Sequence, residues 1–416
     1  MNEAESRGLH YGWIVLGMGT LVVFAALGLA RFGYSMVLPP MQAGLALDNT
    51  QAGALATVNL IGYLVLSALG GAAASRFGPR AVIVTGLAVA ASGMVLTGLA
   101  QGFAGAAAWR GVTGLGSGAS NVPVMGLMAA WFAPRRRGLA SGVAVAGSSI
   151  ALIALGPSVP AILAQYGDTG WRACWFIFAA ATLLLAILAL LLLRNSPTAV
   201  GLRPVGATEE ATDASAASAA PAWGLVYRRR AVWHLGLVYV AFGFAYVIYI
   251  TFFVKYLVGE AGYSQAEAGR LFMTMGWFSL LCGLIWGSVS DAIGRRGAMA
   301  IVYVIQAVSF ALFGFDSGAT GITISAILFG LTAWSIPAIV AAGCGDICGS
   351  RLAPAALGFV TLFFGIGQAA GPVAAGAIAD ATGSLQPAML LAAGVSILGV
   401  LGSITLRPTK IGQHSH

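Results

Sequence analysis

The chain has 416 residues, of which 59% are hydrophobic and only 8% are charged. Soluble domains carry about 25% charged residues, so this composition excludes an ordinary globular protein. The net charge of +8 could indicate nucleic acid binding, but the basic residues are placed as membrane topology requires, and we expect no nucleic acid partner. The four cysteines show no metal-ligand spacing with histidine, so we expect neither a metal nor a cofactor.

Apolar stretches of about the length of a bilayer span follow one another along the whole chain. There are twelve of them, at residues 12–38, 52–73, 81–101, 105–131, 139–163, 173–193, 232–257, 269–289, 298–315, 320–343, 356–378 and 387–406. A helix needs about 20 mostly apolar residues to cross the hydrocarbon core, and barrel strands of about 10 alternating residues do not fit stretches of this kind. The sequence therefore predicts an all-α membrane protein with 12 transmembrane helices in a lipid bilayer.

The basic residues predict the orientation of these spans. If the N-terminus is cytoplasmic and the spans alternate, 16 of the 21 Lys and Arg fall on the cytoplasmic side. The opposite orientation would place the same 16 outside, against the positive-inside bias. We therefore expect both termini in the cytoplasm.

The chain divides into two halves of six spans each. Residues 195–230 are rich in Ala, Ser, Thr and Pro and contain nothing that should bury a core, so they are predicted to form a cytoplasmic linker. The segment 71–80 (GAAASRFGPR) lies between spans 2 and 3, and 287–296 (GSVSDAIGRR) lies at the matching place between spans 8 and 9. We therefore expect an N-terminal bundle (1–194) and a C-terminal bundle (231–416) around a shared central site.

These segments resemble the loop signatures of the major facilitator superfamily of secondary transporters. The second copy matches fully, whereas Ser75 stands in the first copy where that family usually has aspartate. Span 4 also carries the family spacing R-x3-G-x-G-x-G, which begins at Arg110. The resemblance implies two pseudo-symmetric six-helix bundles, a location in the bacterial inner membrane and a monomeric transporter. It also implies conformational roles for Gly71, Arg76, Gly78, Arg80, Arg110, Gly287, Asp291, Gly294, Arg295 and Arg296.

Two segments are similar to particular branches of the superfamily. WFAPRRRGLASGVAVAGSSI (131–150) resembles monocarboxylate and oxalate/formate-type transporters, and LARFGYSMVLPPMQ (29–42) resembles bacterial transporters of poorly defined substrate. Arg31 falls where animal monocarboxylate transporters carry a lysine that is thought to engage substrate and proton. The acidic start of span 1 and the Asp/Arg pair of span 8, both typical of that branch, are missing.

Arg31 is the leading candidate for a substrate contact. A charge inside a span costs about 3 kcal/mol on insertion scales unless it faces a cavity or a partner, and span 1 contains no carboxylate. An arginine fork binds a carboxylate through two hydrogen bonds, so we expect Arg31 to anchor an anion. The alternative is an arginine that reaches to the outer membrane interface.

Other polar and aromatic residues in the spans are candidates for lining the same cavity. Asn121 lies on the same helix face as Arg110, about three turns away, and could donate a hydrogen bond to substrate. The alternative is that its side chain forms an interhelical hydrogen bond. The other candidates, for which packing is the alternative, are Tyr34, Asn59, Tyr63, Tyr246, Tyr249, Trp277, Trp334, Phe363, Phe364 and Gln368. Lys255 lies near an outer span end, where we expect it to reach to the interface.

All 13 Asp and Glu lie in loops, tails or helix ends, so a buried carboxylate relay for protons is not evident. A centre with cations and no acids favours an anionic substrate. We therefore predict a secondary transporter, not an enzyme, that moves a small organic anion, in the first place a monocarboxylate, together with protons. The alternatives are an exporter of hydrophobic or drug-like compounds and a transporter-like membrane sensor, against which the short loops argue.

Overall fold

The computed structural model describes residues 10–207, 224–349 and 352–406, which are helical almost throughout. The first half contains α1 (Tyr11–Val23), η1 (Phe24–Phe32), α2 (Gly33–Gly44), α3 (Asn49–Phe77), α4 (Pro79–Leu99), α5 (Phe103–Trp131), α6 (Pro134–Tyr166), η2 (Gly167–Thr169), α7 (Gly170–Leu192) and η3 (Pro197–Val200). The second half contains α8 (Gly224–Tyr227), α9 (Arg230–Gly259), α10 (Gln265–Ile293), α11 (Arg295–Gly314), α12 (Gly318–Thr332), α13 (Ser335–Cys348), α14 (Ala353–Thr382) and α15 (Gln386–Thr405).

Length and composition identify the membrane-crossing helices. Within the described residues, nine helical stretches are long and apolar enough to cross a membrane, or ten if α10, which bends by 41°, is one span. Two of the nine contain paired helices, because Pro134–Leu192 comprises α6 and α7, and Gly318–Cys348 comprises α12 and α13. The prediction of an all-helical, multi-spanning membrane protein is confirmed at this level.

The ends of the helices show that the two halves repeat one local design. α3 begins in a capping box formed by Asp48 and Gln51, and α10 begins in a capping box formed by Ser264 and Glu267. Each box satisfies N–H groups that have no partner in the first helical turn. α3 and α10 end at Gly78 and Gly294, both with φ +84°, a conformation that favours glycine. The sharp turns into α4 and α11 therefore have the same physical cause in both halves.

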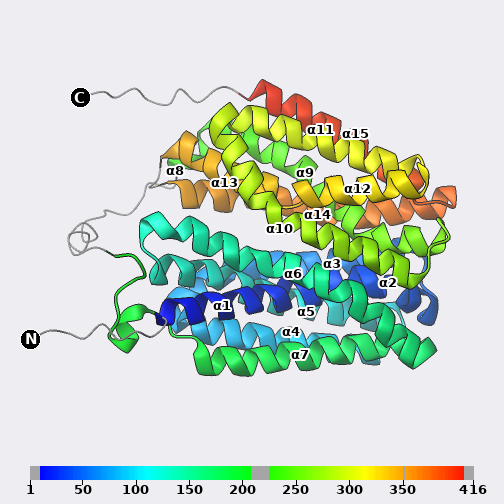
Figure 1. Ribbon diagram of the computed structural model, residues 1–416, viewed down its shortest axis with the longest axis horizontal. Coiled ribbons are helices and arrows are strands. Elements are labelled where there is room, and N and C mark those ends of the chain that lie inside the picture. The colour runs from blue at the N-terminus through cyan, green and yellow to red at the C-terminus, as the bar shows by residue number, and fades with distance from the viewer. Residues whose placement is uncertain (1–9, 208–223, 350–351, 407–416) are drawn as a thin grey trace, which may run out of the picture.

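The two halves form two bundles that lie side by side (Figure 1). They meet mainly where α3 packs on α14 and α6 packs on α10. Glycine allows this close approach: a Cβ at Gly53 would lie 2.1 Å from the carbonyl oxygen of Pro372, and a Cβ at Gly156 would lie 2.5 Å from that of Gly269. The interface between the bundles is therefore built from backbone-to-backbone contacts that any larger side chain would separate.

The bundles are joined at one end of the molecule. We call the end that contains residues 44–49, 259–265 and 380–386 the Asn49 end, and the opposite end, with residues 77–79 and 293–295, the Phe77 end. Among the described residues, eight pairs are joined by hydrogen bonds between the bundles. They are Arg31 with Tyr246, Met36 with Gln265, Gln42 with Lys255, Asn49 with Asp380, Thr50 with Asp380, Thr57 with Ala369, Ser149 with Ser279, and Ser149 with Trp334. All of them lie between the middle of the helices and the Asn49 end. In the described residues no such bond is found near the Phe77 end, so the bundles are closed at the Asn49 end.

Parts of the predicted linker pack against the bundles, which differs from the expectation that nothing in it is buried. Val205 is 5% exposed, and its backbone N–H donates to the carbonyl of Trp131 at 2.8 Å. Val226 in α8 is 1% exposed. Single apolar residues of the polar segment, Val205 and Val226, are therefore buried against the bundles. Val205 also uses a backbone carbonyl at the end of α5 as its hydrogen-bond acceptor. The centre of the linker lies outside the described residues.

Candidate functional site

The candidate arginine of the first span lies on a segment of π-helix, η1, between α1 and α2. A π-helix bonds each N–H five residues back and often marks functional sites. Its altered register leaves backbone carbonyls available, and α5 supplies donors for two of them. The hydroxyl of Ser117 donates to the carbonyl of Ala26, and Nη1 of Arg110 donates to the carbonyl of Ala30 at 2.7 Å. α5 therefore holds the segment that carries Arg31.

Arg31 contacts the opposite bundle through a hydroxyl group. Its Nη2 donates to the hydroxyl oxygen of Tyr246 on α9, and Nε2 of Gln368 on α14 donates to the same oxygen at 3.0 Å. In the described residues no carboxylate lies within ion-pair distance of Arg31. Oε1 of Gln368 is buried and has no hydrogen-bond partner there. We call Arg31, Tyr246 and Gln368 the central cluster, since they join three helices and both bundles at mid-span.

Stacked aromatic rings surround the central cluster on the side of the second bundle. The ring of Tyr246 stacks on that of Phe242 with centroids 5.0 Å apart, and the rings of Tyr239 and Phe364 stack at 4.5 Å. Trp334 meets Tyr246 edge-on at 6.3 Å. Tyr239, Phe242 and Tyr246 share one face of α9 at spacings of three and four residues, and this periodicity was the sequence signal for the two that our prediction missed.

Arg110 is buried within the bundle that carries Arg31, and most of its contacts are to that bundle. Its side chain is 1% exposed, and the guanidinium lies 4.7 Å from the ring centroid of Tyr34 and 5.0 Å from that of Trp175. Its backbone carbonyl accepts a hydrogen bond from Nδ2 of Asn59 at 2.9 Å. Tyr34 in turn donates to a carbonyl of α3 at 2.7 Å. Tyr34, Asn59 and Arg110 thus form one interhelical network between α2, α3 and α5, and Arg110 also reaches η1 through Ala30.

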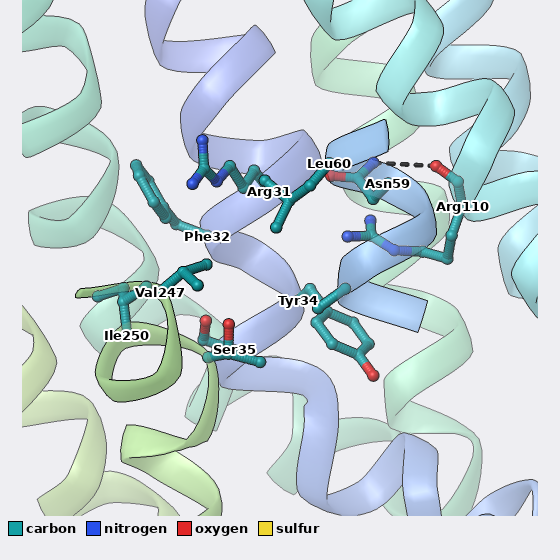
Figure 2. A pocket seen from close by; sticks show the side chains of 11 residues that line it. Arg31, Phe32, Tyr34, Ser35, Asn59, Leu60, Arg110, Val247 and Ile250 are labelled. Carbon is teal, nitrogen blue, oxygen red and sulfur yellow. Dashed lines mark hydrogen bonds between the residues drawn. The ribbon is translucent and has the colours of Figure 1, made fainter. Parts of the chain in front are cut away.

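A small cavity separates Arg31 from this network (Figure 2). Its volume is about 10 Å³, which is room for about one water molecule. It is lined by Arg31, Phe32, Tyr34, Ser35, Ala56, Asn59, Leu60, Arg110, Val247, Ile250 and Thr251. Figure 2 shows that Arg31 and Arg110 reach its lining from two different helices. The space on this side of Arg31 is too small for an organic anion.

Asn121 and Tyr63 form a second polar pair in the first bundle. Nδ2 of Asn121 donates to the hydroxyl oxygen of Tyr63 at 2.9 Å, and Oδ1 of Asn121 is buried without a partner in the described residues. Within the described part of the chain, the buried Oδ1 leaves this pair with an unused hydrogen-bond acceptor.

Three predicted cavity residues lie elsewhere. Tyr249 donates to or accepts from Ser325 at 2.7 Å and packs among phenylalanine rings inside the second bundle. Phe363 packs edge-on against Trp233 at 5.5 Å, away from the stack that holds Phe364. Trp277 is 56% exposed. The structure thus places these three aromatic residues in packing or surface positions, and helical spacing alone did not distinguish them from Tyr246.

Lys255 is a correction of a different kind, because we expected it to reach to the membrane interface. Its Nζ instead donates to Oε1 of Gln42 in the opposite bundle. The two residues line an open cleft of about 450 Å³ at the Asn49 end. Sequence analysis did not identify Gln42 as its partner, since the two are brought together only by the meeting of the bundles.

The two loop signatures differ in their charge pairs, as expected from Ser75, which stands in the first copy in place of aspartate. In the second, Asp291 pairs with Arg295 at 2.5 Å, and Arg295 also pairs with Asp346 of α13 at 3.0 Å. In the first, Ser75 donates only to a carbonyl of its own helix, at 3.0 Å. Arg80 donates to the carbonyl of Leu190, and Arg76 lies over the ring of Phe77 at 5.3 Å. In the described part of the chain, a Cβ at Gly71 or Gly287 would meet open space.

Two further residues of the interface, Ser149 and Ser279, were not anticipated. Ser279 of α10 donates to the hydroxyl of Ser149 of α6 at 2.7 Å, and Nε1 of Trp334 donates to the same oxygen at 3.1 Å. Serine at mid-span is common in helix contacts, so the sequence held no signal that separated this pair from ordinary packing.

A helical chain with two repeated bundles and a polar cluster between them is the architecture of a secondary transporter. The chain belongs to the major facilitator superfamily: the family model described as "Uncharacterised MFS-type transporter YbfB" matches residues 23–403. It is 25% identical over 95% of its length to 94% of the "Probable sulfoacetate transporter SauU" of Cupriavidus necator. It is 24% identical over 98% of its length to 91% of "Monocarboxylate transporter 13" of Rattus norvegicus.

The fold is also found among solved structures. The chain is similar to a bacterial homologue of the human lysosomal transporter Spinster, solved in an inward-facing and unoccupied conformation. The TM-score is 0.79 at 16% sequence identity, over 97% of this chain and 98% of the other. The predicted resemblance to the superfamily, including its monocarboxylate branch, is confirmed, and the chain is a transporter and not an enzyme.

Proposed function

We propose that this transporter moves a small organic anion, in the first place a monocarboxylate, together with protons by alternating access. The observation that carries the proposal is the guanidinium of Arg31, which has no carboxylate partner in the described residues and lies at the interface of the bundles. A buried cation is stable only if polar groups or a counter-ion satisfy it, and a carboxylate matches its fork. The names of two relatives, which refer to sulfoacetate and monocarboxylates, support an organic anion.

The architecture of the proposal is two six-helix bundles, 1–194 and 231–416, joined by the cytoplasmic linker 195–230. If α1, η1 and α2 count as one span and α12 and α13 as another, the long helices α3–α7, α9–α11, α14 and α15 complete twelve. The proposed orientation places both termini and the Phe77 end in the cytoplasm of a bacterial cell, with the chain in the inner membrane as a monomer. The closed Asn49 end is then the outer end, and the conformation is inward-open.

The orientation can be tested with one cysteine. Ala199 in η3 is exposed and belongs to the proposed cytoplasmic linker. An Ala199→Cys variant should resist a membrane-impermeant maleimide in intact cells and react once the membrane is permeabilised. Labelling in intact cells would reverse the proposed orientation.

The charge of the central cluster supports a monovalent substrate. Arg31 is the cation available there, since the guanidinium of Arg110 donates to a backbone carbonyl and lies between two aromatic rings. A second negative charge on the substrate would have to enter a low-dielectric site without a partner, which is costly. Matched acids that differ by one carboxylate should therefore bind with a preference for the monoacid.

The route of the proton follows from the absence of acids at the centre. Asp and Glu lie in loops, tails or helix ends along the whole sequence, so we propose that the proton moves with the substrate, as the neutral acid or as a charge that neutralises the anion beside Arg31. Proton coupling should then depend on Arg31.

The test is binding and transport by Arg31 variants. Thermal stabilisation of the purified protein across a panel of small acids identifies a ligand, because ligands of the folded state raise apparent stability. Arg31→Ala should then weaken binding by about 2–5 kcal/mol, at least tenfold, and Arg31→Lys should retain part of it because the charge survives without the fork. Unchanged binding by Arg31→Ala would refute the anion site and favour the export of hydrophobic compounds, for which the aromatic stack would be the contact surface.

A further inference from the structure

The hydroxyl group of Tyr246 occupies the position at Arg31 that a substrate oxygen should take. Arg31 and Tyr246 belong to opposite bundles, and the guanidinium donates to the phenolic oxygen. A guanidinium has five N–H donors, and this bond is the one that Arg31 makes to a protein acceptor within the described residues. The phenol is thus a neutral acceptor that the protein itself offers to the guanidinium.

Tyr246 is held in that position from two sides. Nε2 of Gln368 donates to its oxygen at 3.0 Å, and its ring lies nearly parallel to those of Phe242 and Phe364, with centroids 5.0 and 6.1 Å away. Tyr246 and Gln368 are 2% and 0% exposed. A side chain fixed by stacking and by a buried amide cannot easily leave, so its hydroxyl is available to Arg31 whenever the bundles close around an empty centre.

This contact matters because an alternating-access transporter must reorient in two states, loaded and empty. In the loaded state a carboxylate satisfies Arg31, since charge-assisted hydrogen bonds are roughly twice as strong as neutral ones. In the empty state the same guanidinium must pass through an occluded form without a counter-ion, and a buried charge without hydrogen bonds is strongly disfavoured. Some acceptor in the protein must therefore replace the substrate for the empty carrier to return.

We propose that Tyr246 is this acceptor: its hydroxyl satisfies Arg31 in the empty carrier and thereby permits net transport, and Gln368 positions it. The inference rests on the proposed function, because it assumes that an anion binds Arg31. A carrier without the hydroxyl would be restricted to exchange of one anion for another, since exchange never requires the empty carrier to reorient.

The experiment compares net uptake with exchange in proteoliposomes, using a radiolabelled acid from the thermal-shift panel. Net uptake is driven by a proton gradient into empty vesicles, and exchange is counterflow into vesicles preloaded with the unlabelled acid. For Tyr246→Phe the ratio of net uptake to exchange should fall at least about tenfold relative to wild type, as expected when a buried polar group loses its partner. Gln368→Leu should shift the ratio in the same direction and by less.

Tyr249→Phe is the matched control, because its hydroxyl lies one turn away on α9 and bonds Ser325 within the second bundle. It should leave the ratio at the wild-type value. A Tyr246→Phe protein in which both rates fall together, or in which neither changes, overturns the inference while Arg31 remains the anion site. If wild type exchanges none of the acids, the proposed function itself fails and this inference fails with it.

Discussion

Asp380, near the end of α14, joins the two bundles at the Asn49 end. Its Oδ1 accepts from the backbone N–H of Asn49 at 3.0 Å, and its Oδ2 accepts from the backbone N–H and the hydroxyl of Thr50 at 2.8 and 2.6 Å. The first N–H groups of a helix have no helical partner and favour negative charge. A carboxylate from the second bundle thus caps α3 of the first, and we predict that it stabilises the closed Asn49 end.

The magnitude follows from these contacts. Asp380→Asn preserves the size of the side chain but removes its charge and one acceptor. Each exposed contact of this kind contributes about 0.2–1 kcal/mol, and negative charge at a helix N-terminus contributes a further 0.3–1 kcal/mol or so. Because the three contacts are exposed to solvent, we expect about 1–2 kcal/mol in total, which changes an equilibrium roughly 5–30-fold.

Spin-label distances between the bundles measure this equilibrium. Ala164 on α6 and Ala381 on α14 are exposed near the Asn49 end and belong to opposite bundles. With labels at both positions, wild type should give one short distance, and Asp380→Asn should add a longer one in proportion to the shift. Asp168→Asn, an exposed carboxylate of η2 at the same end, is the matched control and should leave the distribution unchanged. Equal distributions for Asp380→Asn and wild type would refute the argument.

Three more predictions concern the interface and its supports. Arg110→Gln should lower the apparent melting temperature, because the buried bond from a charged donor to Ala30 is worth about 1.5–3 kcal/mol; an unchanged melting curve would contradict the support that α5 gives to η1. Gly53→Val should increase the population with the longer distance between the same two labels. A Cβ at Gly53 would lie 2.1 Å from a carbonyl oxygen of α14, and overpacking costs about 1–3 kcal/mol. Asp291→Asn should slow exchange without changing the Kd. Asp291 pairs with Arg295 at 2.5 Å in the loop signature, far from the central cluster. A defect in affinity alone would count against a conformational role of this pair.

The sequence by itself determined the membrane class, indicated the two-bundle repeat and singled out Arg31 as the leading candidate for a substrate contact. Runs of apolar residues specify spans because lipid offers no partner for backbone groups, so span positions could be read directly. The family resemblance implied conformational roles for Gly78 and Gly294, and the structure gives both a φ of +84°, which favours glycine. Arg31 was identified because a charge inside an apolar span is costly and needs a reason.

Tertiary structure decided which candidates meet. Tyr246 and Tyr249 are three residues apart on one helix, yet only Tyr246 reaches Arg31, while Tyr249 bonds Ser325. The π-register of η1, the capping of α3 by Asp380 and the pairing of Lys255 with Gln42 all depend on contacts between segments remote in sequence. In a membrane the periodicity of a helix shows which residues share a face, but nearly every face is apolar. The polar partner of each group is therefore fixed only when the bundles come together.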